Sequence, residues 1–249
     1  MEDPGPSNVI PFPAHRRGTI EDTLSGFAGR ERAEGWFTER AERPATSLFV
    51  ELRGWRTIVD LAGPIQAEET LTRVVRRALE ALSALGAGEL TVGGEPMQPV
   101  LSCWFEGEGH ALRGLLAASA VREAADDAQP SVLPGHRFQA CAGLASGTVV
   151  DAGVGAKGDL RFRSVGTIRM FAARLQEFAG PGQVFLSRDT AELAAPRARV
   201  RSIGEVRVNS AGERREAFLL TGIAGHSSTT GTTGAADAAV PQAPPLTQD

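Results

Sequence analysis

The sequence predicts an α+β fold in which helices cover an antiparallel sheet. Strand-like and helix-like runs follow one another in the order strand, helix, strand, strand, helix, strand, hairpin, helix, strand, and this order is typical of the α+β class. A chain of 249 residues with 42% hydrophobic residues is also long enough to bury one sizeable core. We therefore expect one globular domain with ragged ends.

Three helices are predicted from their apolar residues. The stretch 64–85 has apolar residues at helical spacing, at Leu71, Val74, Val75, Ala78, Leu79 and Leu82. The stretch 110–125 is rich in alanine and leucine, and a third helix is expected over 169–178. These three helices should cover the sheet.

The strands are predicted from short β-branched and apolar runs. They are expected at 47–52, 90–92, 100–105, 138–150, 160–165 and 184–187. Gly93 and Gly94 separate the second run from the third, which predicts a hairpin at that point.

The two ends of the chain are predicted to lie outside the domain. Residues 1–18 are rich in Pro and Gly, residues 224–249 are rich in Ser, Thr, Ala and Pro, and neither has an apolar period, so both are expected to be disordered. Residues 19–44 are densely charged with apolar residues near a helical period, which predicts a helical lead-in that ends at Pro44. The domain itself is expected over 45–223.

Charge and hydropathy narrow the range of partners and compartments. A net charge of -4 gives no electrostatic reason to expect nucleic acid or an anionic membrane as a partner. The chain has no apolar run long enough to span a bilayer and no secretory signal, so we expect a cytoplasmic protein. Its two cysteines, Cys103 and Cys141, lie in apolar runs and are expected to be buried, reduced thiols.

The segment Gly153–Gly158 matches the glycine pattern of a dinucleotide-binding loop. In that fold the loop opens a helix whose N-terminus binds pyrophosphate. Here the residues that follow, 159–165, alternate between apolar and polar, which predicts a strand. We therefore interpret the segment as the tip of a glycine-rich hairpin.

Four segments carry a family resemblance. They read S-L-F-V-E-L-R-G-W over 47–55, an apolar hairpin over 92–105, A-G-L-A-S-G-T-V-V over 142–150, and V-G-T-I-R-M-F-A-A-R-L-Q over 165–176, the last followed by G-P-G-Q-V-F-L-S. In order and register these segments resemble the catalytic domain of class III adenylate/guanylate cyclases, from Thr46 to Ile223. The resemblance implies a ferredoxin-like antiparallel sheet covered by helices, and active sites at a head-to-tail dimer interface.

The resemblance also implies which residues stand at the metal-binding positions. The family reaction needs two divalent metals held by oxygen ligands, and two aspartates supply them. Glu51 matches the first aspartate and Pro99 the second. Glu51 keeps a carboxylate, whereas the side chain of Pro99 has no ligand atom.

The substrate-binding positions are substituted as well. Glu95 matches the base-selecting lysine, Arg163 the base-selecting Asp or Thr, and Met170 the asparagine that orients the ribose. Only Arg174 keeps the family's residue, at the arginine that stabilises charge in the transition state.

The sequence therefore favours a catalytically degenerate cyclase homology domain that acts as a regulatory or scaffolding signalling module. It would work as a homodimer, or as a heterodimer with another cyclase-like or signalling protein. Three alternatives remain open: a subunit of a heteromeric cyclase, a pocket rebuilt to bind a nucleotide or another anion, and a generic α+β binding domain. No cofactor is expected, and Mg or Mn would be needed only if cyclase activity persists.

Overall fold

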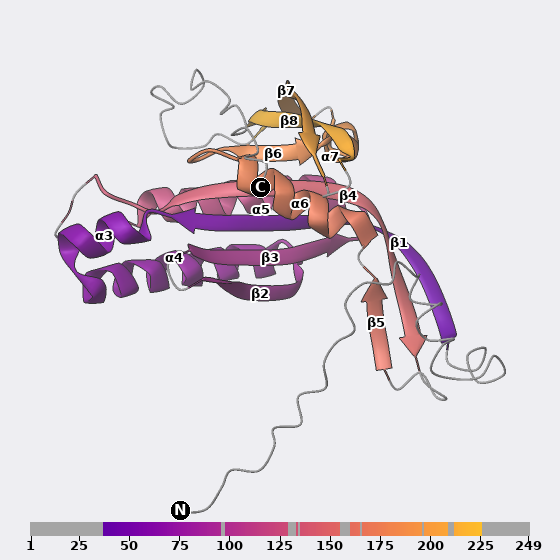
Figure 1. Cartoon of the computed structure of the whole chain (residues 1–249), viewed down its shortest axis with the longest axis horizontal. Coiled ribbons are helices and arrows are strands. Elements are labelled where there is room, and N and C mark those ends of the chain that lie inside the picture. The colour runs from indigo at the N-terminus through magenta and orange to yellow at the C-terminus, as the bar shows by residue number, and fades with distance from the viewer. Residues whose placement is uncertain are drawn as a thin grey trace, which may run out of the picture. The chain divides into compact units, whose positions relative to one another are not determined.

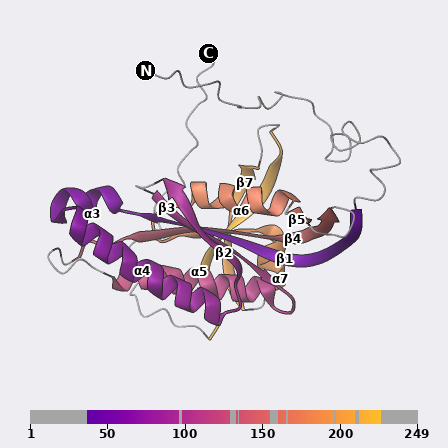
Figure 2. The ribbon, with the colours of Figure 1, turned by 90° about the horizontal axis from the view of Figure 1, so that it is seen from below.

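Helices cover both faces of one large sheet in the computed structural model (Figures 1 and 2). The structure describes residues 37–95, 98–128, 133, 135–154, 160–164, 166–195, 197–208 and 212–225. The chain divides into two compact units, Met1–Arg40 with Ala152–Phe162, and Ala41–Asp151 with Arg163–Asp249. All described helices and both hydrophobic cores belong to the second unit.

The sheet has eight strands. Seven are ordered β2-β3-β1-β4-β6-β8-β7, and β5 pairs with β4. The pairings β1–β3, β2–β3, β6–β8 and β7–β8 are antiparallel, whereas β4 and β6 are parallel. The predicted α+β class is confirmed, with one parallel pair inside the sheet. The strands are β1 (Phe37–Arg53), β2 (Gly88–Glu95), β3 (Gln98–Glu106), β4 (Gln139–Val154), β5 (Leu160–Ser164), β6 (Val184–Ser187), β7 (Ala198–Arg207) and β8 (Arg214–Ile223).

Alternation along β1 separates the two cores. Leu48, Val50 and Leu52 belong to the core that α4 and α5 cover, whereas Phe49 packs against the core under α6. In Figure 2, α6 lies across the face of the sheet opposite α4 and α5. The helices are α3 (Trp55–Ala62), α4 (Pro64–Ala84), α5 (His110–Asp127), α6 (Gly166–Phe178) and α7 (Arg188–Ala194).

Helices α4, α5 and α6 match the three predicted helices, with α6 beginning three residues early. Two parts of the domain were not predicted. The short helix α3 follows Gly54, whose φ of 112° is left-handed and turns the chain out of β1. After β6, the chain adds α7 and the β7–β8 hairpin, so the run at 184–187 is not the closing strand.

The predicted helical lead-in is wrong over residues 37–44, which are the first part of β1. Proline disfavours a helical conformation in the residue before it, so Pro44 holds Arg43 extended instead of ending a helix. Two of the charged residues that suggested a helix, Glu42 and Arg43, lie on this strand, and Arg43 forms an ion pair with Glu106 at the end of β3 (3.3 Å). Residues 19–36 lie outside the described part of the chain.

The β2–β3 hairpin is present, but Gly93 and Gly94 are not its turn. Both lie inside β2, opposite Val100 and Pro99, and the strand pairing continues to Glu95 and Gln98. Positions 96 and 97 lie outside the described residues. Of the glycine-rich hairpin tip predicted from Gly153 to Gly158, Gly153 and Val154 end β4. The remainder, 155–158, also lies outside the described residues, as do the predicted disordered segments apart from the turn at Ala224 and Gly225.

Candidate functional site

Glu51, which matches the family's first metal ligand, lines a hollow of about 490 Å³. The hollow lies between β1, the β2–β3 hairpin and α6. Alternation along β1 puts Glu51 and Arg53 on the face that α6 covers. The hollow is lined by Glu51, Arg53, Gly94, Gln98, Val100, Gln176 and Glu177.

Glu51 is 7% exposed. One oxygen of its carboxylate, Oε2, is bonded to two neighbouring side chains. Its Oε2 accepts hydrogen bonds from Arg53 Nε (2.9 Å) and Gln176 Nε2 (2.6 Å), and Arg53 Nη2 lies 2.8 Å away. Charge-assisted bonds of this kind are stronger than neutral ones. The negative charge of Glu51 is therefore balanced inside the protein.

Arg53 is also fixed by hydrogen bonds, both to Glu51 and to the backbone. Its Nη1 donates to the carbonyl oxygen of Ala179 (2.8 Å), just after α6. Burial alone would lower the pKa of Arg53, but the hydrogen bond to Glu51 and the nearby Cys141 and Glu51 raise it overall, so the guanidinium stays charged. A fixed positive charge therefore lies beside Glu51, where the family's metal ions would need to approach.

Pro99, the residue matched to the second metal ligand, does not share this hollow. Val100 lies opposite Glu51 in the β1–β3 register, and Pro99, one residue earlier, belongs to the other face of the strand. Gln98, two residues before Val100, lines the hollow in its place. The hollow that Glu51 lines is thus also lined by a neutral amide, and not by the Pro99 position.

Two predicted substrate-side residues, Met170 and Arg174, lie on the exposed side of α6. Met170 is 57% exposed. Arg174, one turn later, pairs with Glu177 and lies over the ring of Phe178, with 6.0 Å from its Cζ to the ring centroid. Neither Met170 nor Arg174 lines the hollow around Glu51. Within one chain, therefore, the structure does not bring Arg174 to Glu51.

The remaining two predicted positions are described only by their backbone. Glu95 is the last residue of β2, opposite Gln98, and Arg163 lies in β5. Their side chains lie outside the described part of the structure.

The side chains of the hollow do not fit a pair of divalent metals. Hard cations need several oxygen ligands, carboxylates above all. The two carboxylates in the hollow, Glu51 and Glu177, each have an arginine partner already, Arg53 and Arg174. Across the described residues, no group of three His, Cys, Asp or Glu side chains is arranged to hold a metal ion.

Both cysteines are free and buried, as the sequence predicted. Burial raises the pKa of Cys103 to about 12. Burial also raises the pKa of Cys141 to about 11, although the nearby Arg53 opposes the shift. Both groups are therefore neutral thiols at physiological pH, and neither is set up as a nucleophile.

Sequence reasoning singled out Glu51 but missed the two residues that bond to it, Arg53 and Gln176, and also Gln98, which lines the same hollow. Arg53 could have been found, because residues two apart on a strand share a face and a carboxylate beside an arginine suggests an ion pair. Gln98 required the strand register. Gln176 lies 125 positions from Glu51 in the sequence, and no local signal connects the two.

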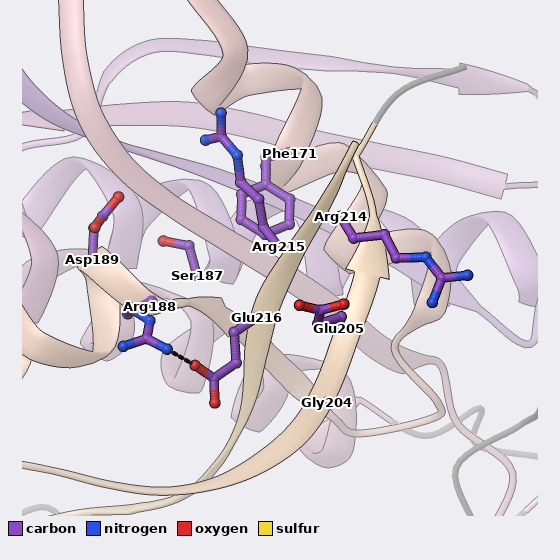
Figure 3. A pocket seen from close by; sticks show the side chains of 9 residues that line it. All are labelled: Phe171, Ser187, Arg188, Asp189, Gly204, Glu205, Arg214, Arg215 and Glu216. Atoms are coloured by element: carbon purple, nitrogen blue, oxygen red, sulfur yellow. Dashed lines mark hydrogen bonds and ion pairs between the residues drawn. The ribbon is translucent and has the colours of Figure 1, made fainter. Parts of the chain in front are cut away.

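A second hollow, of about 480 Å³, lies between α6, α7 and the β7–β8 hairpin (Figure 3). Several charged side chains line it, and two of them are paired with one another. Arg188 pairs with Glu216, and Arg215 lies over the ring of Phe171. Ser187, the last residue of β6, also lines it. None of the predicted site residues whose side chains the structure describes lines it.

Comparison with known proteins connects the chain to one fold. No protein-family model matches the sequence, and no curated protein matches it as a relative. Among solved structures, it is similar to the adenylyl cyclase CyaB from P. aeruginosa, with 14% identity, a TM-score of 0.58, and coverage of 73% of this chain and 95% of that one. It is also similar to the guanylyl cyclase Cya2, with 20% identity, a TM-score of 0.59, and coverage of 74% and 94%.

A further similar structure is a non-canonical dimeric guanylyl cyclase domain of the RhoGC fusion protein from the aquatic fungus Blastocladiella emersonii. It has 15% identity and a TM-score of 0.59, with coverage of 75% of this chain and 99% of that one. These similarities show that the chain has the fold of class III adenylyl and guanylyl cyclase catalytic domains. Among the described residues, no helix is both long and apolar enough to cross a membrane.

Proposed function

We propose that this domain of the class III cyclase fold has lost nucleotide cyclisation and serves as a regulatory or scaffolding module in signalling. It would act by forming a homodimer or by pairing with a cyclase-like or signalling partner. The observation that carries the proposal is the closed ion pair at Glu51, whose carboxylate is neutralised by Arg53 and held by Gln176.

A metal ion that bound Oε2 of Glu51 would have to displace Arg53. That displacement would break the bonds that Arg53 donates to Glu51 and to Ala179, and it would leave a partly buried guanidinium without its carboxylate. Removing one partner from a buried pair is strongly destabilising. The second metal position offers no compensation, because Pro99 has no ligand atom and lies on the other face of β3.

The residues that would bind the nucleotide substrate also lack the groups that the reaction needs. Arg174 is engaged by Glu177 on the surface of α6, and Met170 cannot replace an asparagine as a hydrogen-bonding group. Such a chain would contribute neither metals nor a ribose-orienting group to a partner's active site. A pairing function is left, and one structurally similar guanylyl cyclase domain has been solved as a non-canonical dimer.

Thermal unfolding with nucleotides tests the loss of catalysis. We expect no midpoint shift that depends on manganese when ATP or GTP is added, and no formation of cyclic nucleotide. A ligand at a hundred times its dissociation constant would add about 2.7 kcal/mol and be seen easily. The Arg174→Ala variant is the matched control, and it should behave as the wild type does.

A manganese-dependent shift that disappears in Arg174→Ala would contradict the proposal and indicate a working cyclase site. A shift that needs no metal would indicate a rebuilt ligand pocket instead. Sedimentation of the purified chain tests the other half of the proposal. A concentration-dependent dimer supports self-pairing, whereas a strict monomer that also fails to associate with any active cyclase domain would contradict the pairing role.

A further inference from the structure

A third hollow lies between helix α4 and the end of helix α5, and it is lined mainly by arginines. Its volume is about 410 Å³, and its lining residues are Arg73, Arg76, Arg77, Asp127 and Ala128. It shares none of them with the two hollows described above. Figure 2 shows α4 and α5 side by side on the face of the sheet opposite α6. The third hollow therefore lies on the opposite side of the sheet from the Glu51 hollow.

The helical spacing of α4 brings the three arginines together. Residues three and four positions apart are neighbours on a helix surface, so Arg73, Arg76 and Arg77 share one side of α4. Their sequence neighbours Val74 and Ala78 are buried in the core and fix the orientation of the helix. All three arginines therefore remain exposed at the surface.

The charges around this hollow do not balance. Among the described residues that line it, Asp127 is the only carboxylate. Asp127 is also the last residue of α5, and the C-terminal end of a helix adds about half a negative charge. The three guanidinium groups thus face about 1.5 negative charges, which leaves about 1.5 positive charges uncompensated. This local excess contrasts with the net charge of -4 of the whole chain.

Arg76 and Arg77 are open to an external ligand. Arg76 makes no hydrogen bond or ion pair with any residue that the structure describes. Arg77 Nη1 lies 3.5 Å from Asp127 Oδ2, and the two side chains are 56% and 63% exposed. Such exposed pairs contribute little to stability, so a ligand can displace Asp127 at small cost. Arg73 Nη2 donates to Thr70 Oγ1 (3.3 Å), and this bond uses one of the five N–H donors of the guanidinium.

We propose that this hollow binds a phosphate monoester, with Arg76 and Arg77 as its principal ligands and Arg73 beside them. A phosphate monoester carries nearly two negative charges at neutral pH and has three strong acceptor oxygens. Its charge matches the excess in the hollow, and its oxygens match the fork of N–H donors that a guanidinium presents. A carboxylate offers one charge and two oxygens, so it would leave part of the excess uncompensated.

The surroundings of the hollow favour a single phosphate group over a polyanion. Helix α4 also carries the exposed carboxylates of Glu68, Glu69 and Glu80. A nucleic acid or an anionic membrane binds through an extended basic surface, and these carboxylates would repel it. The phosphate would belong either to a phosphorylated side chain of a partner protein or to a small phosphorylated metabolite.

This site is independent of the proposed loss of cyclisation, because the hollow contains none of the residues matched to the cyclase positions. It does imply that the phosphates of ATP can bind here weakly without a metal ion. A metal-independent effect of ATP that disappears in Arg76→Gln would belong to this site, whereas one that persists would belong to another pocket. The two proposals can therefore fail separately.

Nuclear magnetic resonance of the full chain tests the site, with the arginine Nε–H signals as local reporters. The probe is a glycine pentapeptide with phosphoserine at its centre, added at low salt so that an exposed site is weakly screened. We expect saturable shifts of the Arg76 and Arg77 signals, with a dissociation constant of about 1 mM or below. The same peptide with serine should not bind. The peptide with glutamate should bind about tenfold more weakly, because it carries one charge instead of two.

Three exposed substitutions assign the binding to the arginines. Arg76→Gln should weaken binding of the phosphopeptide about tenfold, the loss expected for one charge-assisted hydrogen bond. Asp127→Asn should tighten it about threefold, because Arg77 is released from its exposed pair. Arg207→Gln is the matched control, since it removes the same charge from an exposed arginine of β7 that lines none of the three hollows. This control should leave the affinity unchanged.

Glycerol phosphate distinguishes the two sources of the phosphate group. Binding about tenfold weaker than that of the phosphopeptide would support a phosphorylated segment of a partner protein, and equal binding would support a small metabolite. Three results would overturn the proposal: no saturable shift with the phosphopeptide, equal binding of the glutamate peptide, or a loss of affinity in Arg207→Gln as large as that in Arg76→Gln.

Discussion

Replacement of Gly143 by alanine is expected to destabilise the domain by about 3 kcal/mol, at the upper end of the cost of overpacking a core. Gly143 lies on β4 at the point where α6 crosses the sheet. A Cβ there would lie 2.2 Å from the carbonyl oxygen of Ala172 and 2.3 Å from the backbone nitrogen of Gln176. These are backbone atoms of a helix, so no rotamer change can make room.

The same crossing controls the Glu51 hollow. Gln176, whose backbone nitrogen the new Cβ would meet, donates its side-chain amide to Glu51. If α6 moves away from β4 to accommodate a methyl group, Gln176 moves with it and this bond weakens. Gly143→Ala should therefore loosen the packing of the core under α6 and weaken the hydrogen bond from Gln176 to Glu51.

Urea unfolding followed by circular dichroism measures the effect, with the midpoint and slope both fitted. Gly93→Ala is the matched control, because a Cβ at Gly93 meets nothing within 4 Å. That variant should be neutral or slightly stabilised, since alanine restricts the unfolded chain. Equal losses in the two variants, or a loss below 1 kcal/mol in Gly143→Ala, would show that the crossing is looser than the distances indicate.

The contrast between α4 and α7 shows which parts of the fold could be predicted from sequence. Helix α4 is long and buries Val74, Ala78 and Leu82 on one stripe, so its periodicity is visible in the sequence. Helix α7 has seven residues, too few for a period to stand out, and its start depends on the cap formed by Ser187. Similarly, β7 is mostly exposed, with no buried alternation to indicate a strand.

The sequence offered Glu51 as a candidate site residue, but it did not show which groups surround that carboxylate. The resemblance located Glu51, yet the charge of a carboxylate depends on which groups meet it in space. Arg53 was near enough to consider, whereas Gln176 and the carbonyl of Ala179 come from the far end of α6. For Pro99, the match along the sequence did not reveal the face of β3 on which that residue lies.

Replacement of Arg53 by methionine is expected to cost about 3 kcal/mol at neutral pH, the lower end of the range for breaking a buried ion pair. The lower end applies because the Arg53 side chain is 31% exposed. Methionine keeps much of the packing but removes both bonds to Glu51 and the bond to Ala179. Glu51 would then remain buried with Gln176 as its remaining hydrogen-bond partner among those described.

A double-mutant cycle with Glu51→Gln separates the charge from the packing. Glu51→Gln alone should cost about 1 kcal/mol, the usual value of a hydrogen-bonded interaction, because the amide oxygen can still accept from Gln176. The double variant should be more stable than Arg53→Met alone, because no uncompensated charge is left in the hollow. Arg174→Ala, which breaks an exposed pair, provides the control and should change stability by less than about 1 kcal/mol.

The cycle also shows whether Glu51 is neutralised by Arg53 or is available to bind a metal ion. If Arg53 neutralises Glu51, the wild type should be insensitive to manganese, and Arg53→Met should become the variant that manganese stabilises, because the freed carboxylate can then attract a cation. If the wild type is stabilised by manganese and Arg53→Met unfolds at the same urea concentration as the wild type, Arg53 does not neutralise Glu51. The carboxylate would then be open to metal, and the proposed loss of cyclisation would lose its main support.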